Sequence, residues 1–147
     1  MKIILLTGNH KTGKSTTFDV LYNMLTKCMK NPPVKQPIRT GSPEDFQCVI
    51  KYKCKKIALY SHGDTLYLIH EAIIRYSEVD YLVLAFSLGG ADYQQVLNFI
   101  VNNCPQHTVI NKTVSTNAAN QVADNKIDCA AIKTAIRKQC KFIRLFS

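Results

Sequence analysis

The chain has 147 residues, of which 46% are hydrophobic and 20% are charged. This balance is ordinary for a folded domain and excludes a disordered chain, and the length suffices to bury a core without disulfides or structural metal. No apolar run approaches the roughly 18 residues of a membrane span, and the apolar N-terminal stretch is too short for a signal peptide. We therefore expect one cytoplasmic domain over residues 1–147 that binds no membrane.

The positive charge, +9 overall, is concentrated in two parts of the sequence. Residues 1–56 carry eleven basic and three acidic side chains, residues 112–147 carry seven and two, and the stretch between them carries one and five. If the fold brings the two basic segments onto one face, that face attracts phosphate-bearing or acidic partners. The alternative is an ordinary solvated surface. Aromatic residues are not interleaved with Lys and Arg in a recognisable RNA-binding pattern, so nucleic acid is the less favoured partner and stays open as an alternative.

The first elements are a strand, a helix and a long loop. Lys2–Thr7 is a continuous apolar run, typical of a strand buried on both faces of a parallel sheet. Apolar residues at helical spacing predict a helix over 14–29 that ends before Asn31-Pro32-Pro33. Residues 31–45 hold four of the five prolines and are expected to form a loop long enough to have a functional role.

Strands and helices alternate in the rest of the chain. Phe46–Lys51 and Lys56–Ser61 are β-type runs that predict an antiparallel hairpin. The remaining patterns predict helices over about 65–77 and 91–104, strands at Tyr81–Ser87 and Thr108–Asn111, and a last helix from about Asp128. This order predicts a three-layer α/β domain, with a mostly parallel sheet of about five strands and one antiparallel edge hairpin.

Six cysteines stand at irregular spacings without any C-x-x-C pair. This usage favours small buried hydrophobic side chains over a zinc site or a disulfide framework. A metal or disulfide joining Cys48 and Cys54 across the expected hairpin is the alternative.

A phosphate-binding pattern directly follows the first strand. The residues Gly8-Asn9-His10-Lys11-Thr12-Gly13-Lys14-Ser15 fit G-x-x-x-x-G-K-[ST] at every fixed position. Glycines let the backbone approach a phosphate closely, and the N-terminus of the following helix favours the same anion. Lys14 is expected to reach the β- and γ-phosphates and the Ser15 hydroxyl to ligate Mg²⁺, while Thr16 completes the cradle. The competing interpretation is a glycine-rich turn with an exposed lysine.

Over Gly8 to Thr16 the chain resembles the P-loop NTPase superfamily, whose Walker A motif these residues match. The resemblance implies a P-loop fold that binds a nucleoside triphosphate with Mg²⁺ and transfers or hydrolyses its γ-phosphate. We expect ATP rather than GTP as the nucleotide, and hydrolysis as the reaction. Two alternatives stay open. One is a small-molecule or nucleotide kinase in which residues 31–45 close over an acceptor, and the other is a GTPase-like switch or partner-binding module with slow turnover.

The resemblance also implies a carboxylate beside Mg²⁺, placed at the end of a strand. Asp64 is the candidate for this metal-binding and catalytic role, although it stands three residues after Ser61 instead of directly ending the strand. Asp64 is equally suited to cap the following helix. His62 in the same loop either contacts water or phosphate, or is an idle exposed side chain.

Two stretches are similar to the Asn-Lys-x-Asp motif with which GTPases read guanine. Asn125-Lys126-Ile127-Asp128 matches the motif but does not follow a strand, and capping of the last helix by Asp124 or Asn125 explains it more simply. Asn111-Lys112-Thr113-Val114 follows a strand and has valine where the motif has aspartate. These stretches do not establish GTP as the nucleotide.

Overall fold

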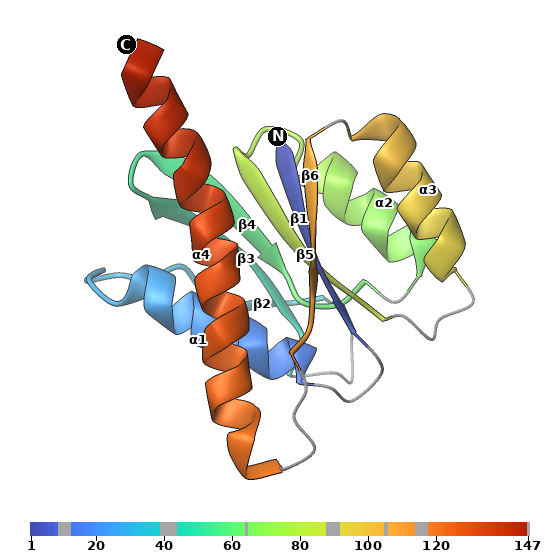
Figure 1. Ribbon diagram of the computed structural model, residues 1–147, viewed down its shortest axis with the longest axis horizontal. Coiled ribbons are helices and arrows are strands. Elements are labelled where there is room, and N and C mark those ends of the chain that lie inside the picture. Colours follow the sequence, from blue (N-terminus) through green and yellow to red (C-terminus); the bar gives the residue numbers. More distant parts are fainter. Residues whose placement is uncertain are drawn as a thin grey trace.

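The computed structural model of the chain is an α/β fold, a sheet with helices on both faces (Figure 1). The residues that it describes are 1–8, 13–38, 44–63, 65–87, 92–104, 106–113 and 118–146, without the side chains of residue 118 and residues 137–146. The strands are β1 (Lys2–Gly8), β2 (Gln36–Pro37), β3 (Phe46–Tyr52), β4 (Lys55–Tyr60), β5 (Tyr81–Ser87) and β6 (His107–Asn111). The helices are α1 (Lys14–Thr26), α2 (Leu66–Arg75), α3 (Tyr93–Asn103) and α4 (Gln121–Phe146), with a 3-10 turn at Ala118–Asn120.

The strands form one mixed sheet in the order β2-β3-β4-β5-β1-β6. Strands β4, β5, β1 and β6 run parallel, whereas β3 runs antiparallel to β4 and to β2. The expected hairpin is therefore confirmed. The expected loop over 31–45 contains a sixth, two-residue strand, because Gln36 and Pro37 pair with the start of β3.

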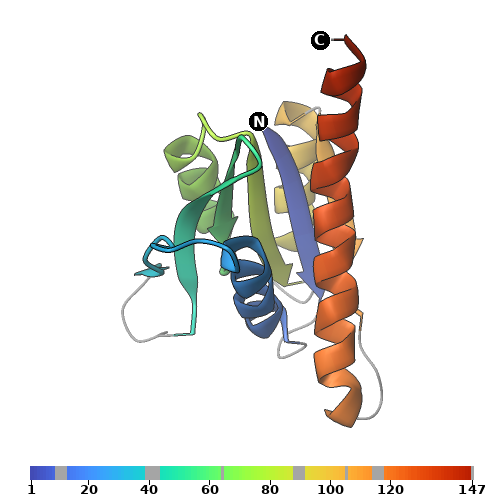
Figure 2. The same cartoon turned by 90° about the vertical axis from the view of Figure 1, so that its left-hand side faces the viewer.

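Two apolar cores, one on each face of the sheet, hold the layers together. Helices α1 and α4 cover one face, and α2 and α3 cover the other (Figures 1 and 2). Successive residues of β1 point to opposite faces, so Ile4 joins the core under α1 and α4 while Ile3 joins the core under α2 and α3. A strand buried on both faces needs an unbroken apolar run, which is why the sequence of β1 does not alternate. The arrangement is compatible with the expected three layers.

Helix α4 begins at Gln121, seven residues before the predicted start at Asp128. Residues 121–126 are mostly polar, so the sequence pattern there does not indicate a helix. Asp124, Asn125 and Asp128 are nevertheless buried in its first two turns. The prediction that Asp124 or Asn125 caps this helix is therefore wrong, since both lie inside it.

Within the described ranges, no helix combines the length and the apolar character that crossing a bilayer requires.

The cysteines whose side chains are described are all free thiols. Cys48, Cys104 and Cys129 are buried, as the sequence predicts, while Cys28 and Cys54 are exposed. In the hairpin Cys48 stands opposite Leu59, not opposite Cys54, so the alternative of a bridged pair is wrong.

Candidate phosphate and metal site

The first turn of α1 is built around Gly13. Its φ of +85° lies in the left-handed region, and a Cβ there would come 2.6 Å from Nε2 of Gln121 on α4. The helix starts with the N–H of Thr17 donating to the Gly13 carbonyl at 2.9 Å. No described side chain caps this turn, and the turn contains no acidic residue. The leading N–H groups of a helix lack partners within the helix, so a turn without a capping side chain or a carboxylate suits an anion.

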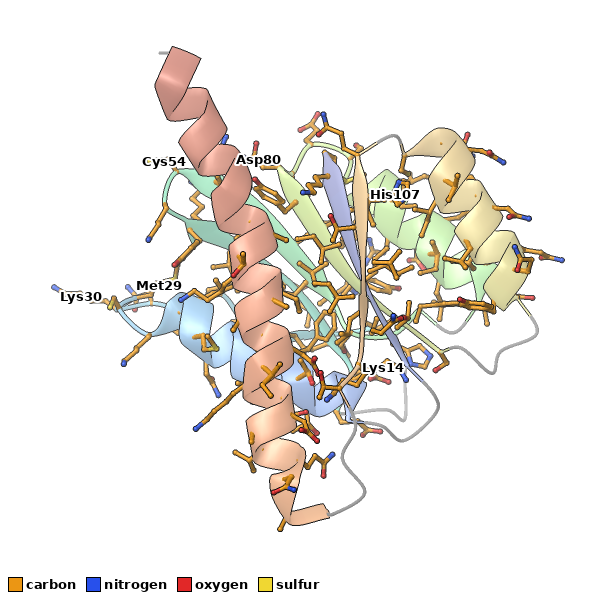
Figure 3. The ribbon with its side chains drawn as sticks, viewed as in Figure 1. Lys14, Met29, Lys30, Cys54, Asp80 and His107 are labelled. Carbon is orange, nitrogen blue, oxygen red and sulfur yellow. The ribbon has the colours of Figure 1, made fainter. Side chains whose placement is uncertain are left out.

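Lys14, the first residue of α1, reaches back to the end of β1. Its Nζ donates a hydrogen bond to the Gly8 carbonyl at 3.0 Å, and Figure 3 shows Lys14 at this edge of the sheet. Gly8 stands beside Ser87, the last residue of β5, so the ammonium lies where two parallel strands end. Thr16 is exposed in the first turn. The predicted contacts of Asn9, His10, Lys11 and Thr12 lie outside the described residues.

A buried carboxylate stands beside Ser15. The Ser15 hydroxyl donates to Oδ1 of Asp45 at 3.0 Å, and Oδ2 of Asp45 lies 3.1 Å from Nδ1 of His62. Asp45 is 6% exposed and His62 is 9% exposed. Both carboxylate oxygens are therefore held in place by neighbouring side chains, and His62 is a buried partner of Asp45 instead of an idle exposed side chain.

The antiparallel direction of β3 explains why Asp45 reaches this place. Parallel strands end at the edge where α1 begins, whereas β3 starts there, and Asp45 immediately precedes β3. Two hydrogen bonds fix the junction, from the Phe46 N–H to the Ser61 hydroxyl at 2.8 Å and from the Ser61 N–H to the Phe46 carbonyl at 3.1 Å. This pairing aligns Asp45 with His62, the residue after Ser61.

The oxygens of Ser15 and Asp45 form a donor set that fits Mg²⁺, which takes hard oxygen ligands and retains water and substrate phosphates. In the described part of the chain, no three His, Cys, Asp or Glu side chains gather into a metal-binding group. A cation here would take its remaining ligands from phosphate and water. Asp64, the predicted metal ligand, lies outside the described residues, and the cap of α2 is Thr65, whose Oγ1 accepts from the Leu68 N–H at 3.3 Å.

The first turns of α4 pack directly against the start of α1. The Thr17 hydroxyl lies 2.9 Å from the Gly13 carbonyl oxygen and 3.0 Å from Oδ1 of Asn125, which is 2% exposed. Gln121, one turn earlier, lies over Gly13. Helix α4 therefore supports the turn at Gly13, and the Asn125 side chain is a hydrogen-bond partner of α1.

The two stretches that are similar to the guanine motif come together at the end of β6. Asp128 accepts from the N–H and the hydroxyl of Thr113, and its Oδ2 lies 2.8 Å from Nζ of Lys112. The two side chains of this ion pair are 0% and 2% exposed. Asn111 accepts from the Thr7 hydroxyl at 2.8 Å. These groups connect β6 to α4 and β1, and the buried carboxylate is occupied by donors of the protein itself.

A cavity of about 360 Å³ opens beside Asp45, between α1 and the described parts of the 31–45 segment. Its lining residues are Asp19, Lys35, Pro37, Glu44, Asp45 and Phe46. The Lys35 ammonium lies 2.8 Å from Asp19 and 4.7 Å from the centre of the Tyr22 ring. The Tyr22 hydroxyl donates to the Pro33 carbonyl at 2.6 Å. The first part of the proline-rich segment is thus docked on α1 and forms one wall of a cavity that reaches Asp45.

Comparisons of this chain with protein-family models, with curated proteins and with solved structures found no match. What the protein does has to follow from the chemistry of these residues, since a fold alone does not specify a function.

Proposed function

We propose that the chain is a P-loop NTPase that binds ATP with Mg²⁺ and hydrolyses its γ-phosphate. One observation carries the proposal. The serine of the Walker A pattern donates to the buried carboxylate of Asp45 at 3.0 Å, at the edge where β1 ends and α1 begins. A hydroxyl and a carboxylate in this position are the two protein ligands that Mg²⁺ typically has in a triphosphate site.

The described residues of the candidate site have the following roles in this proposal. The N–H groups of the first turn of α1 bind phosphate oxygens, and the Lys14 ammonium exchanges the Gly8 carbonyl for the more strongly attracting phosphates. Ser15 and Asp45 hold the cation, which neutralises charge on the transferred phosphoryl group. His62 keeps the Asp45 carboxylate oriented through its second oxygen. ATP is favoured over GTP because Asp128, in the stretch similar to the guanine motif, is buried against Lys112 and Thr113.

The test is ATP binding and hydrolysis by the wild-type chain and by Lys14→Ala. Calorimetry with ATP and Mg²⁺ should give measurable heat for the wild type, and loss of the ammonium should weaken binding at least tenfold and abolish release of inorganic phosphate. Lys35→Ala is the matched control, because it removes a lysine whose ammonium pairs with Asp19 instead of the Gly8 carbonyl. Equal affinity of wild type and Lys14→Ala for ATP would exclude a P-loop site.

A second candidate function is a phosphotransferase, and the cavity beside Asp45 favours it. A molecule in this cavity would lie next to the proposed metal site, where a γ-phosphoryl group would be transferred. The described lining contains Asp19, Glu44 and Asp45 against a single Lys35, so it suits a neutral or cationic hydroxyl compound better than a phosphorylated one. Incubation with ATP labelled at the γ-phosphate distinguishes the two functions. A hydrolase releases all label as inorganic phosphate, whereas a kinase places it on a second product.

A further inference from the structure

The turn between β3 and β4 carries a dense group of positive charges. Lys51, Lys53, Lys55 and Lys56 fall within six consecutive residues, which we call the lysine hairpin (residues 51–56). All four are exposed or half-buried, and the hairpin contains no acidic residue. Figure 3 shows Cys54 at the tip of this turn and Lys14 at the opposite end of the sheet, so the lysine hairpin is separate from the candidate phosphate site.

Two features of the lysine hairpin destabilise it. Lys51 stands directly opposite Lys56 in the strand register, and like charges in this position repel each other. Lys53 and Cys54 have φ angles of +48° and +66°, in the left-handed region where Asn and Gly are the ordinary choice for a two-residue hairpin turn. The turn therefore retains lysines at positions where other residues would be more stable, and a bound anion would relieve the repulsion.

Helix α4 adds a lysine from the second basic part of the sequence. Nζ of Lys133 lies 6.0 Å from the centre of the Tyr52 ring, and Nζ of Lys53 lies 5.4 Å from it. The Tyr52 ring is half-buried, and one side of it packs against the core under α1 and α4. At the base of the hairpin, Asp80 accepts a hydrogen bond from the Lys56 N–H at 2.8 Å. The two basic segments that are far apart in the sequence thus meet around one tyrosine.

We infer that the lysine hairpin, with Tyr52 and Lys133, binds single-stranded nucleic acid. Lysine ammonium groups on flexible stems bind phosphates without reading sequence. When the exposed Lys53 side chain turns from the Tyr52 ring to a phosphate, the ring supplies a stacking surface for an unpaired base. A membrane surface is disfavoured, because none of the exposed large hydrophobic side chains in the described part of the chain falls within residues 51–56. This site does not depend on the proposed ATP site, and both can be occupied together.

The test compares two triple variants of equal charge by fluorescence anisotropy with labelled single-stranded oligonucleotides of mixed sequence. Lys51→Ser/Lys53→Asn/Lys56→Ser removes three lysines of the hairpin. Lys27→Ser/Lys30→Ser/Lys126→Ser removes three exposed lysines from α4 and the region at the end of α1. The hairpin variant should bind tenfold or more weakly, and its slope of log affinity against log salt should fall by about 2, since each phosphate contact on a single strand contributes about 0.7. The control variant should retain most of the affinity and slope.

Thermal unfolding of the same variants separates loss of binding from loss of folding. The hairpin variant should unfold at a higher temperature than the wild type, because the repulsion and the turn strain are both reduced. Cys54→Gly should also raise the unfolding temperature while leaving binding unchanged. Tyr52→Leu should weaken binding to single strands several-fold more than binding to a duplex.

Three results would overturn the inference. They are equal weakening in both triple variants, absence of oligonucleotide binding by the wild type at low salt, and binding of anionic vesicles or acidic peptides in preference to the oligonucleotides.

Discussion

The hydroxyl oxygen of Ser15 lies 3.0 Å from a carboxylate oxygen of Asp45, a residue thirty positions further along the chain. Ser15 is placed by the first turn of α1 and Asp45 by the start of an antiparallel strand, so two independent elements converge on one point. Because Asp45 is also held by His62, its carboxylate is oriented before any ligand arrives. In the proposed NTPase, a prearranged carboxylate would avoid reorganisation during hydrolysis, which is how electrostatic catalysis works.

Asp45→Asn should separate binding from hydrolysis. The amide keeps the size of the side chain and removes the negative charge that would attract Mg²⁺, so hydrolysis at saturating ATP should fall by about 10²- to 10³-fold. Binding of ATP without Mg²⁺ should change little or become tighter, since a like charge is removed. The measurements are phosphate release across a Mg²⁺ titration and nucleotide binding in chelator. Glu44→Gln, the exposed acid next to Asp45, is the control and should behave as the wild type in both assays. An unchanged Mg²⁺ requirement in Asp45→Asn would show that another group, such as Asp64, holds the metal.

How well the sequence predicts this site differs between its parts. Gly13, Lys14 and Ser15 belong to a contiguous motif between a strand and a helix, and local pattern is sufficient to find them. Asp45 was missed because it ends a proline-rich stretch whose docking on α1 depends on tertiary contacts. A signal for it existed in the predicted hairpin, since an acid just before an antiparallel strand lies at the edge where the parallel strands end. The sequence pattern places the start of α4 too late, because buried polar residues such as Asn125 and Asp128 find their partners only in the folded chain.

The buried pair of Lys112 and Asp128 should be a major determinant of stability. Asp128→Asn leaves the Lys112 ammonium buried without its counter-charge, which should cost about 3–5 kcal/mol in the free energy of unfolding. The double variant Lys112→Met/Asp128→Leu removes both charges and should recover most of this loss. The exposed pair of Lys35 and Asp19 is the control, and Asp19→Asn should cost less than about 1 kcal/mol. Urea unfolding followed by circular dichroism measures all three, and a cost for Asp128→Asn as small as that of Asp19→Asn would contradict the pair's structural role.

Replacing Gly13 or Gly63, two glycines near the candidate site, by alanine should lower the free energy of unfolding by different amounts. In Gly63→Ala the new methyl group would meet the Ala85 carbonyl oxygen at 2.5 Å, and this backbone atom cannot easily move. In Gly13→Ala the methyl group would meet the end of the Gln121 side chain, which can turn away, so the remaining cost is the left-handed backbone, about 1–2 kcal/mol. Gly63→Ala should therefore lower the unfolding free energy more than Gly13→Ala does. In the background Gln121→Ala, Gly13→Ala should still lose about 1–2 kcal/mol. Complete rescue by Gln121→Ala would show that contact with Gln121, and not the backbone angle, requires glycine at position 13.

Cysteine reactivity should follow burial. Desolvation raises the pKa of the Cys48 thiol to about 11 and that of the Cys129 thiol to about 12, so almost no thiolate is present at either residue at pH 8. The Cys129 thiol also donates to the Thr17 carbonyl at 3.3 Å, beneath the candidate site.

Alkylation at pH 8 followed by peptide mass spectrometry should label the exposed Cys28 and Cys54 within minutes and leave Cys48 and Cys129 unmodified until urea is added. Because the folded pKa values of Cys48 and Cys129 are raised, the stability tied to their neutral thiols is complete below the unfolded thiol pKa of about 8.5. This stability should decrease as the pH rises above the unfolded thiol pKa toward the folded pKa values of about 11 and about 12. Cys129→Ala should reduce this alkaline loss of stability, whereas Cys54→Ala should not. Labelling of Cys129 as fast as Cys54 in the native protein would mean that α4 does not stay packed on α1 in solution, and with it the support behind Gly13 would be lost.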